Sequence, residues 1–227
     1  MSEATHGNPA PLPIVILISG SGSNLQAIID AIRDEALPVE IRAVISNRPD
    51  AFGLERARAA HIPTEVIDHT RFSSRDEYEQ VLQQRIDRYN PALIVLAGYM
   101  RILGKALVDH YQGRMLNVHP SLLPAFPGLN THQRALDAAV AEHGASIHFV
   151  TNELDGGPVI IQAAVPILPG DDAATLAKHV HLQEHIIYPL AIRWFAEGRL
   201  TTTAGKVMFD RQPLYQPLQY NAATDVS

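Results

Sequence analysis

Two polar side chains that could take part in catalysis stand in segment 115–128, at the end of an apolar, strand-like run. Asn117 and His119 are two residues apart, and side chains with this spacing on a strand point to the same face of a sheet. Pro120 biases His119 away from a helical conformation, which favours a strand that ends there. An amide and an imidazole would then lie side by side at a strand end, where α/β sheets usually bind ligands. The alternative interpretation is a polar pair that serves the structure alone.

Asp155 is a candidate third member of this group. It precedes Gly156 and Gly157, and an aspartate in such a turn usually caps the local backbone. The functional interpretation is that Asp155 faces His119 across the sheet end. A carboxylate there would orient the imidazole and favour its charged form. The sequence alone leaves both interpretations open.

A loop rich in glycine and serine, residues 19–23, separates a predicted strand from a predicted helix. Backbone amides at a helix N-terminus favour an anion such as a phosphate, and Ser23 is the expected N-cap. Leu25 stands where a dinucleotide fingerprint has its third glycine, and the lysine of a Walker motif is absent. NAD and ATP therefore fit poorly. A single phosphate group and an ordinary turn remain the two interpretations.

Residues 181–185 match the H-x-x-E-H zinc pattern, with two histidines one helical turn apart. The chain has 11 histidines, which makes chance matches common, and the pattern names no third ligand. We therefore expect no metal site.

The amino-acid composition limits the classes of protein to which the chain can belong. The chain has 227 residues, 46% of them hydrophobic and 19% charged, with a net charge of −6. These values indicate a globular α/β protein, and the absence of a basic cluster argues against nucleic-acid binding. No apolar run approaches the ~20 residues that span a membrane. Cysteine is absent, which excludes disulfides and thiol chemistry and fits a cytoplasmic protein.

Apolar periodicity predicts alternating strands and helices. Strands are expected at 14–18, 41–45, 64–67, 92–97 and 115–119, and helices at 24–36, 51–60, 74–89 and 103–111. This order predicts a doubly wound, mostly parallel sheet. Residues 74–77 have the form of a capping box, which makes Ser74 the expected N-cap of the helix at 74–89.

The pattern changes in the second half of the chain. A helix is expected at 131–140, and two extended runs at 145–151 and 158–165 predict an antiparallel hairpin that reverses tightly at Gly156 and Gly157. A long helix is expected from about Asp172, interrupted near Pro189 and ending before Gly198. We predict a mobile N-terminal extension (1–13), a single domain (14–203) and a C-terminal tail (204–227) that is a weak strand or loop.

Several motifs together resemble the phosphoribosylglycinamide formyltransferase family. They are segments 18–27, 46–47, 51–56, 96–103, 116–124, 144–151 and 155–158, and the resemblance covers about residues 14–200. The Asn-x-His-Pro-Ser motif at 117–121 is shared with other formyl-folate enzymes. The Gly-Ser-Gly-Ser-Asn loop at 20–24 and the chain length narrow the resemblance to this family, which implies its Rossmann-like formyltransferase fold.

The resemblance implies a formyl transfer from 10-formyltetrahydrofolate, as co-substrate and without a metal, to glycinamide ribonucleotide in de novo purine biosynthesis. The implied catalytic residues are Asn117, His119 and Asp155. The implied ribonucleotide site consists of Gly22, Ser23, Asn24, His181, Leu182, Gln183 and Glu184. The implied folate site consists of Arg75, Met100, Arg101, Ile102, Leu103, Asn117, Thr151, Asn152, Glu153, Leu154 and Asp155. The partners would be small molecules, with no nucleic acid or membrane, and the protein a monomer or homodimer.

The sequence departs from the family pattern at two positions, and three other functions are alternatives to the implied one. Asn130 and His181 stand where the family pattern has histidine and glutamine, which puts any contact of these two side chains in doubt. A methionyl-tRNA formyltransferase would need a further C-terminal module with a basic surface. A formyltetrahydrofolate hydrolase would be expected to carry an N-terminal regulatory domain. A non-catalytic nucleotide-binding module would leave Asn117, His119 and Asp155 without a task.

Overall fold

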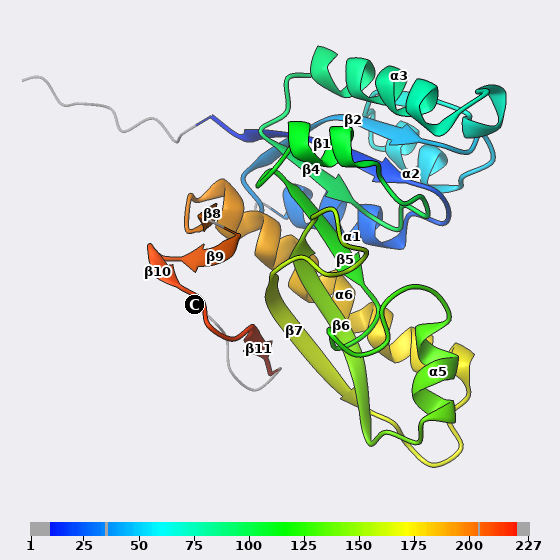
Figure 1. Cartoon of the computed structure of the whole chain (residues 1–227), viewed down its shortest axis with the longest axis vertical. Helices are drawn as coiled ribbons and strands as arrows, with labels where there is room; N and C mark the ends of the chain where they lie inside the picture. The colour runs from blue at the N-terminus through cyan, green and yellow to red at the C-terminus, as the bar shows by residue number, and fades with distance from the viewer. Residues whose placement is uncertain (1–9, 35, 204, 222–227) are drawn as a thin grey trace, which may run out of the picture.

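A mostly parallel sheet forms the centre of the molecule (Figure 1). The computed structural model describes residues 10–34, 36–203 and 205–221, and within them the sheet has eight strands in the order β11-β7-β6-β5-β4-β1-β2-β3. The strands are β1 (Leu12–Ile18), β2 (Val39–Ser46), β3 (Thr64–Val66), β4 (Leu93–Leu96), β5 (Met115–His119), β6 (Glu142–Phe149), β7 (Val159–Pro166) and β11 (Leu218–Tyr220). Strands β1 to β5 pair in parallel, whereas β6 pairs antiparallel with both β5 and β7. The predicted doubly wound sheet and its antiparallel hairpin are confirmed.

Helices cover both faces of this sheet. They are α1 (Ser23–Arg33), α2 (Gly53–Ala59), α3 (Arg75–Arg88), α4 (Lys105–His110), α5 (Thr131–Asp137) and α6 (Ala173–Ala196), with a short 3₁₀ helix η1 (His69–Arg71). Ile14 and Ile16 of β1 pack in a core that includes buried residues of α1, α2 and α6. Val15 and Leu17 alternate with them and pack in a second core with α3 and α4. The continuous apolar run of β1 therefore reflects burial on both faces.

The predicted N-cap of α3 is confirmed, and that of α1 is wrong. Ser74 accepts a hydrogen bond from the backbone nitrogen of Glu77 at 3.2 Å, although the Glu77 carboxylate binds Ser73. The N-cap of α1 is Gly22 in the left-handed conformation, with φ of 70°, so Ser23 is already helical. A Cβ on Gly22 would lie 2.6 Å from the Cα of Gly53, so α2 packs directly against this loop.

The connection between β6 and β7 differs from the predicted tight reversal. It spans residues 150–158, and the residue with left-handed φ is Asp155, at 50°, rather than either glycine. Aspartate is among the few residues other than glycine that adopt this conformation readily. Gly157 is needed for another reason: a Cβ there would clash with the carbonyl oxygen of Phe149.

The C-terminal segment contributes strands of its own. Strands β8 (Leu200–Thr203), β9 (Lys206–Phe209) and β10 (Gln212–Pro213) form a small antiparallel sheet, and β11 pairs in parallel with β7 at the edge of the main sheet. The segment predicted as a weak strand or loop thus completes that edge. At the other end, β1 begins at Leu12, earlier than expected, and the rest of the predicted extension, residues 1–9, lies outside the described residues.

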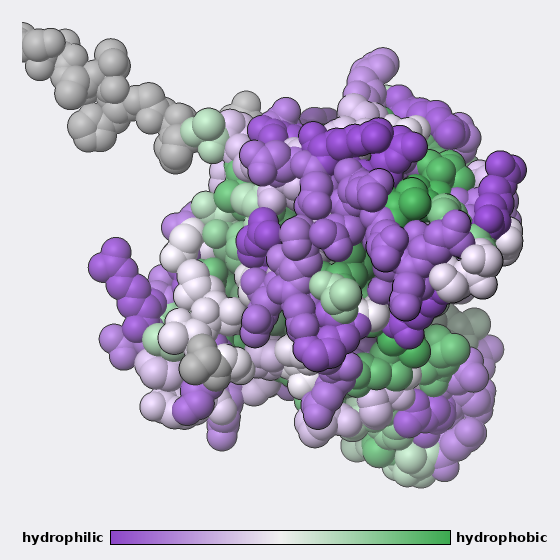
Figure 2. All heavy atoms as spheres, turned by 45° about the horizontal axis from the view of Figure 1, so that its top comes forward, coloured by the Kyte–Doolittle hydropathy of each residue, from purple (hydrophilic) through white to green (hydrophobic). Residues whose placement is uncertain are grey.

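The surface is mainly polar on the face drawn in Figure 2. Hydrophilic side chains cover most of that face, and the hydrophobic ones lie in separate, smaller areas. Among the described residues, no helix combines the length and apolar character needed to cross a membrane.

Gly157→Ala is expected to destabilise the fold, because the added Cβ clashes with backbone that β6 and β7 hold in place. We expect a loss of about 2 kcal/mol or more in the free energy of unfolding, measured by denaturant titration. Gly20→Ala is the matched control, since a Cβ at Gly20 meets no atom within 4 Å. Equal stability of the two variants would contradict the prediction.

Candidate active site

The end of β5 and the β6–β7 loop bring three predicted catalytic residues together. Asn117 and His119 lie on β5, as predicted. The Nδ1 atom of His119 lies 3.4 Å from Oδ2 of Asp155, and both side chains are less than a tenth exposed. The approach of Asp155 to His119 is therefore present in the structure, although the two residues are far apart in sequence.

Backbone groups of the loop after β5 complete the surroundings of His119. Its Nε2 atom donates to the carbonyl oxygen of Phe126 at 3.0 Å. Oδ2 of Asp155 also accepts a hydrogen bond from the backbone nitrogen of Gly128, at 2.8 Å. The same carboxylate thus holds the ring and the loop, and each ring nitrogen of His119 faces an oxygen acceptor.

His148 is a member of this group that sequence reasoning missed. Its Nδ1 atom donates to the carbonyl oxygen of Phe149 at 2.9 Å, and its Nε2 atom lies 3.1 Å from Nδ2 of Asn117. Burial lowers the pKa of His148, which favours the neutral ring. Nε2 then accepts from the Asn117 amide and fixes its orientation. The signal was the cross-strand pairing of Asn117 with His148, which requires knowledge of the β5–β6 register.

A buried polar network holds the loop that follows β5. The Ser146 hydroxyl donates to the carbonyl oxygen of Ser121 at 2.7 Å and accepts from the backbone nitrogen of Leu123 at 3.0 Å. The Gln162 side-chain amide donates to the carbonyl oxygen of Leu123 at 2.8 Å. Strands β6 and β7 therefore fix the segment that leads to Phe126. None of these four residues belongs to a predicted site, although Ser121, Leu123 and Ser146 lie in motif segments that carry the resemblance.

The predicted ribonucleotide residues come from two distant parts of the chain that meet. Nδ2 of Asn24, at the start of α1, donates to Oε2 of Glu184 on α6 at 2.7 Å, and both residues are buried. Burial raises the pKa of Glu184, and the hydrogen bond from Asn24 opposes this effect. Oδ1 of Asn24 has no hydrogen-bond partner among the described residues. The site therefore presents a buried acceptor beside the glycine-rich loop.

The H-x-x-E-H segment has a different geometry from a zinc site. The rings of His181 and His185 stack with centroids 6.3 Å apart, while Glu184 turns to Asn24. Across the part of the chain that the structure describes, no group of three or more histidine, aspartate or glutamate side chains could hold a metal ion. His181 and Leu182 are exposed and Gln183 is half-buried.

Most predicted folate residues lie in two segments, 100–103 before α4 and 151–155 in the β6–β7 loop. Nη2 of Arg75 donates to the carbonyl oxygen of Ile102 at 2.5 Å, which joins α3 to the loop of residues 97–104. The side chains of Met100, Ile102 and Leu154 are 71%, 61% and 55% exposed. Asn152 donates to Asp109 on α4 at 2.9 Å. Three apolar side chains of these segments are therefore exposed to solvent.

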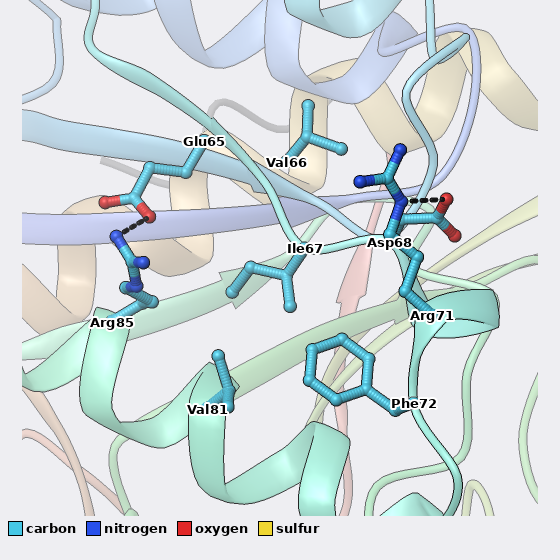
Figure 3. A pocket seen from close by; sticks show the side chains of 8 residues that line it. All are labelled: Glu65, Val66, Ile67, Asp68, Arg71, Phe72, Val81 and Arg85. Atoms are coloured by element: carbon cyan, nitrogen blue, oxygen red, sulfur yellow. Dashed lines mark hydrogen bonds and ion pairs between the residues drawn. The ribbon is translucent and has the colours of Figure 1, made fainter.

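Two hollows differ in their relation to these residues. One, of about 440 Å³, is lined by Thr151, Asn152, Glu153, Gly156, Pro158 and Gly205, so it borders the second folate segment. The other, of about 340 Å³, lies between β3 and α3 and is lined by the eight residues drawn in Figure 3. None of those eight belongs to a predicted site, and their charged members form two internal ion pairs, Arg85 with Glu65 and Arg71 with Asp68.

Comparison with known proteins decides the family. Residues 12–192 match the family model described as formyl transferase. The phosphoribosylglycinamide formyltransferase of Escherichia coli is 55% identical over 201 residues, which are 88% of this chain and 95% of that protein. The chain belongs to the phosphoribosylglycinamide formyltransferase family. The fold agrees with this assignment. The structure of a phosphoribosylglycinamide formyltransferase from Coxiella burnetii matches with a TM-score of 0.90 and 57% identity. The match covers 93% of this chain and all of that one.

Another relative carries this domain as part of a longer chain. The human trifunctional purine biosynthetic protein adenosine-3 is 43% identical over 82% of this chain, which corresponds to 18% of the human protein. The resemblance found in the sequence motifs is thus confirmed at the level of the phosphoribosylglycinamide formyltransferase family. The roles of the individual site residues stay predictions.

His148 is expected to stay neutral, with the proton on Nδ1, as the pH falls through 6.5, its ordinary pKa, because burial penalises the charged ring. The check is a nitrogen-15 NMR titration of the imidazole. We expect a midpoint below 6.5 and the Nδ1–H tautomer at pH 7. A titration midpoint at or above pH 6.5, or a proton on Nε2, would contradict the hydrogen bond that Nε2 of His148 accepts from the Asn117 amide.

Proposed function

We propose that this protein transfers a formyl group from 10-formyltetrahydrofolate to the amine of glycinamide ribonucleotide, as a step of de novo purine biosynthesis. The observation that carries the proposal is the convergence of Asn117, His119 and Asp155 at the end of β5, in a chain of this family. Formyl-folate enters as a co-substrate. A cytoplasmic location and a monomeric or homodimeric state stay predictions.

The reaction needs donors for a developing negative charge. The substrate amine attacks the formyl carbon, a new C–N bond forms, and the carbonyl electron pair moves onto oxygen. The bond from the formyl carbon to the folate nitrogen then breaks, and one proton passes from the amine to that nitrogen. A single positioned donor to such an oxyanion is worth roughly 3 kcal/mol.

Asn117 and a protonated His119 supply these donors in our proposal. One amide hydrogen of Asn117 is engaged by His148, which leaves the other for the oxyanion. His119 donates through Nε2. The carbonyl oxygen of Phe126 holds the acceptor position on Nε2 at 3.0 Å, so the formyl oxygen must replace it during transfer.

Asp155 acts on His119 and on the proton in transit. Its carboxylate lies 3.4 Å from Nδ1 and so directs the Nε2–H bond toward the reacting group. The other oxygen, Oδ1, lies 3.8 Å from Nε2 of His148. We propose that this carboxylate relays the proton from the amine to the folate nitrogen through a water molecule.

The ribonucleotide is proposed to bind across the start of α1 and the middle of α6. Gly22, Ser23 and Asn24 place backbone amides at the N-terminus of an 11-residue helix, where a phosphate is favoured. Glu184 and the free Oδ1 atom of Asn24 offer acceptors for the ribose hydroxyls. His181, Leu182 and Gln183 border this site on the same helix.

The folate is proposed to lie along the two segments beside α4. Exposed Met100, Ile102 and Leu154 would cover its apolar rings, with Arg101, Leu103 and the segment 151–153 around them. Arg75 is 45% exposed at the end of this surface and suits a carboxylate of the folate tail.

Alanine substitution of the catalytic group is expected to slow formyl transfer. For Asn117→Ala and His119→Ala we expect a roughly 10²- to 10³-fold lower single-turnover rate, because each removes a donor to the oxyanion. Asp155→Ala is expected to lose about 10²-fold or more, as a general acid–base contribution. His179→Ala, on α6 outside this group, is the control. A folded His119→Ala protein with a near-wild-type rate of formyl transfer would contradict the mechanism.

Substitution of Glu184 tests the ribonucleotide site separately. Glu184→Gln keeps the shape and loses the charge, so we expect the KM for glycinamide ribonucleotide to rise about tenfold, as for one charge-assisted hydrogen bond. The KM for the formyl-folate should stay unchanged. Steady-state kinetics with each substrate varied in turn gives both values. Product analysis of the same mixtures separates transfer from hydrolysis and from binding without turnover. An unchanged KM for glycinamide ribonucleotide would show that Glu184 does not contribute to binding this substrate.

A further inference from the structure

Glu79 is a buried carboxylate on α3 that the proposed mechanism does not use. Its side chain is 9% exposed, in contrast to the neighbouring acidic residues of the same helix turn, Asp76 and Glu77, which are exposed. Burying a charge is costly unless the group is paired and hydrogen-bonded. The partners of Glu79 therefore indicate what it holds in place.

Those partners connect α3 to the loop between β4 and α4. Oε1 of Glu79 accepts from Nε of Arg75 at 2.9 Å and from the backbone nitrogen of Gly104 at 2.8 Å. Arg75 in turn donates to the carbonyl oxygen of Ile102. One side-chain cation and two backbone groups of the loop thus form a closed bridge with the carboxylate.

Gly104 provides the space for this contact. Its φ is −77°, which any residue can adopt, so glycine is not required here for the backbone conformation. A Cβ on Gly104 would instead clash with Oε2 of Glu79. The missing side chain lets the carboxylate approach the backbone.

The bridge fixes one end of the segment from Met100 to Leu103. The other end is also held, because the backbone nitrogen of Met100 donates to the Ser19 hydroxyl at 2.8 Å, and that hydroxyl donates to Oδ1 of Asn47 at 2.6 Å. Between these anchors, Met100 and Ile102 expose their side chains. Their position thus depends on bonds that neither side chain makes.

We propose that Glu79 is a positioning residue for the formyl-folate. By bridging Arg75 and Gly104 it sets both the guanidinium group and the exposed apolar side chains of Met100 and Ile102 in the arrangement that binds the folate. Glu79 itself does not touch the substrate. This inference rests on the proposed function, because it deepens the assignment of the folate site.

Two substitutions disturb the same contact from opposite sides. Glu79→Gln keeps the side-chain volume and removes the charge, and Gly104→Ala pushes the carboxylate away from the loop. For each we expect the KM for 10-formyltetrahydrofolate to rise about tenfold, the effect of weakening one hydrogen bond to a charged group. The KM for glycinamide ribonucleotide should stay within about twofold and kcat within about threefold, because α1, α6 and β5 are untouched.

A matched control exists on the same helix. Glu65 pairs with Arg85 of α3 at 3.2 Å, as drawn in Figure 3, and lies outside the predicted folate segments. Glu65→Gln also removes an anion from an arginine of α3. We expect both KM values of this variant to match those of the wild-type protein.

The possible outcomes distinguish a failure of the proposed role of Glu79 from a failure of the proposed function. A folate KM within about twofold of wild type in folded Glu79→Gln and Gly104→Ala proteins would overturn the inference, as would an equal rise of both KM values. Should Glu79→Gln fail to fold, Gly104→Ala alone decides. Should the wild-type protein transfer no formyl group, the proposed function fails. Calorimetric binding of tetrahydrofolate then tests the same variants: about tenfold weaker binding supports the role of Glu79, and unchanged binding excludes it.

Discussion

The contact between Asp155 and His119 is the interaction on which the arrangement of the site depends. Both side chains are almost completely buried, and a buried charge or imidazole is stable only with partners. Strand β5 ends at His119. The loop between β6 and β7 returns the chain to that edge and places the Asp155 carboxylate beside Nδ1 of the ring. The change from parallel to antiparallel pairing at β5 is therefore the feature that allows the group to form.

Helix α6 connects this group to the rest of the sheet. The Tyr188 hydroxyl lies 3.0 Å from the carbonyl oxygen of Leu96, the last residue of β4, and 2.9 Å from that of Leu116, the second residue of β5. One helical turn earlier, Glu184 reaches Asn24 at the start of α1. Helix α6 thus links the proposed ribonucleotide site to the strand that carries Asn117 and His119.

Patterns among neighbouring residues predicted the helices and strands. The arrangement of the site depends on contacts between residues that are distant in the sequence. The apolar run of β1 and the Ser74 cap depend on neighbouring residues, so both predictions hold. The prediction of Ser23 as N-cap was wrong because the start of α1 is set by Gly22, which packs on Gly53 at the start of α2, a segment distant in sequence. His148 was missed because its place opposite Asn117 depends on strand register. The charge pattern of α3 does not distinguish buried Glu79 from its exposed neighbours, since only the packed loop at Gly104 buries it.

Asp155 and Glu79 hold their loops in the same way. Each is a buried carboxylate that accepts from a glycine backbone nitrogen, Gly128 or Gly104, and also lies beside a side chain that can carry positive charge, His119 or Arg75. Loops at the end of a sheet have backbone N–H groups that no neighbouring strand can accept. A carboxylate has several lone pairs and forms stronger hydrogen bonds than a neutral acceptor, so one anion can satisfy the loop and orient the side chain together. Buried carboxylates therefore hold these two loops at Gly128 and Gly104, whereas the order of the sheet comes from strand pairing.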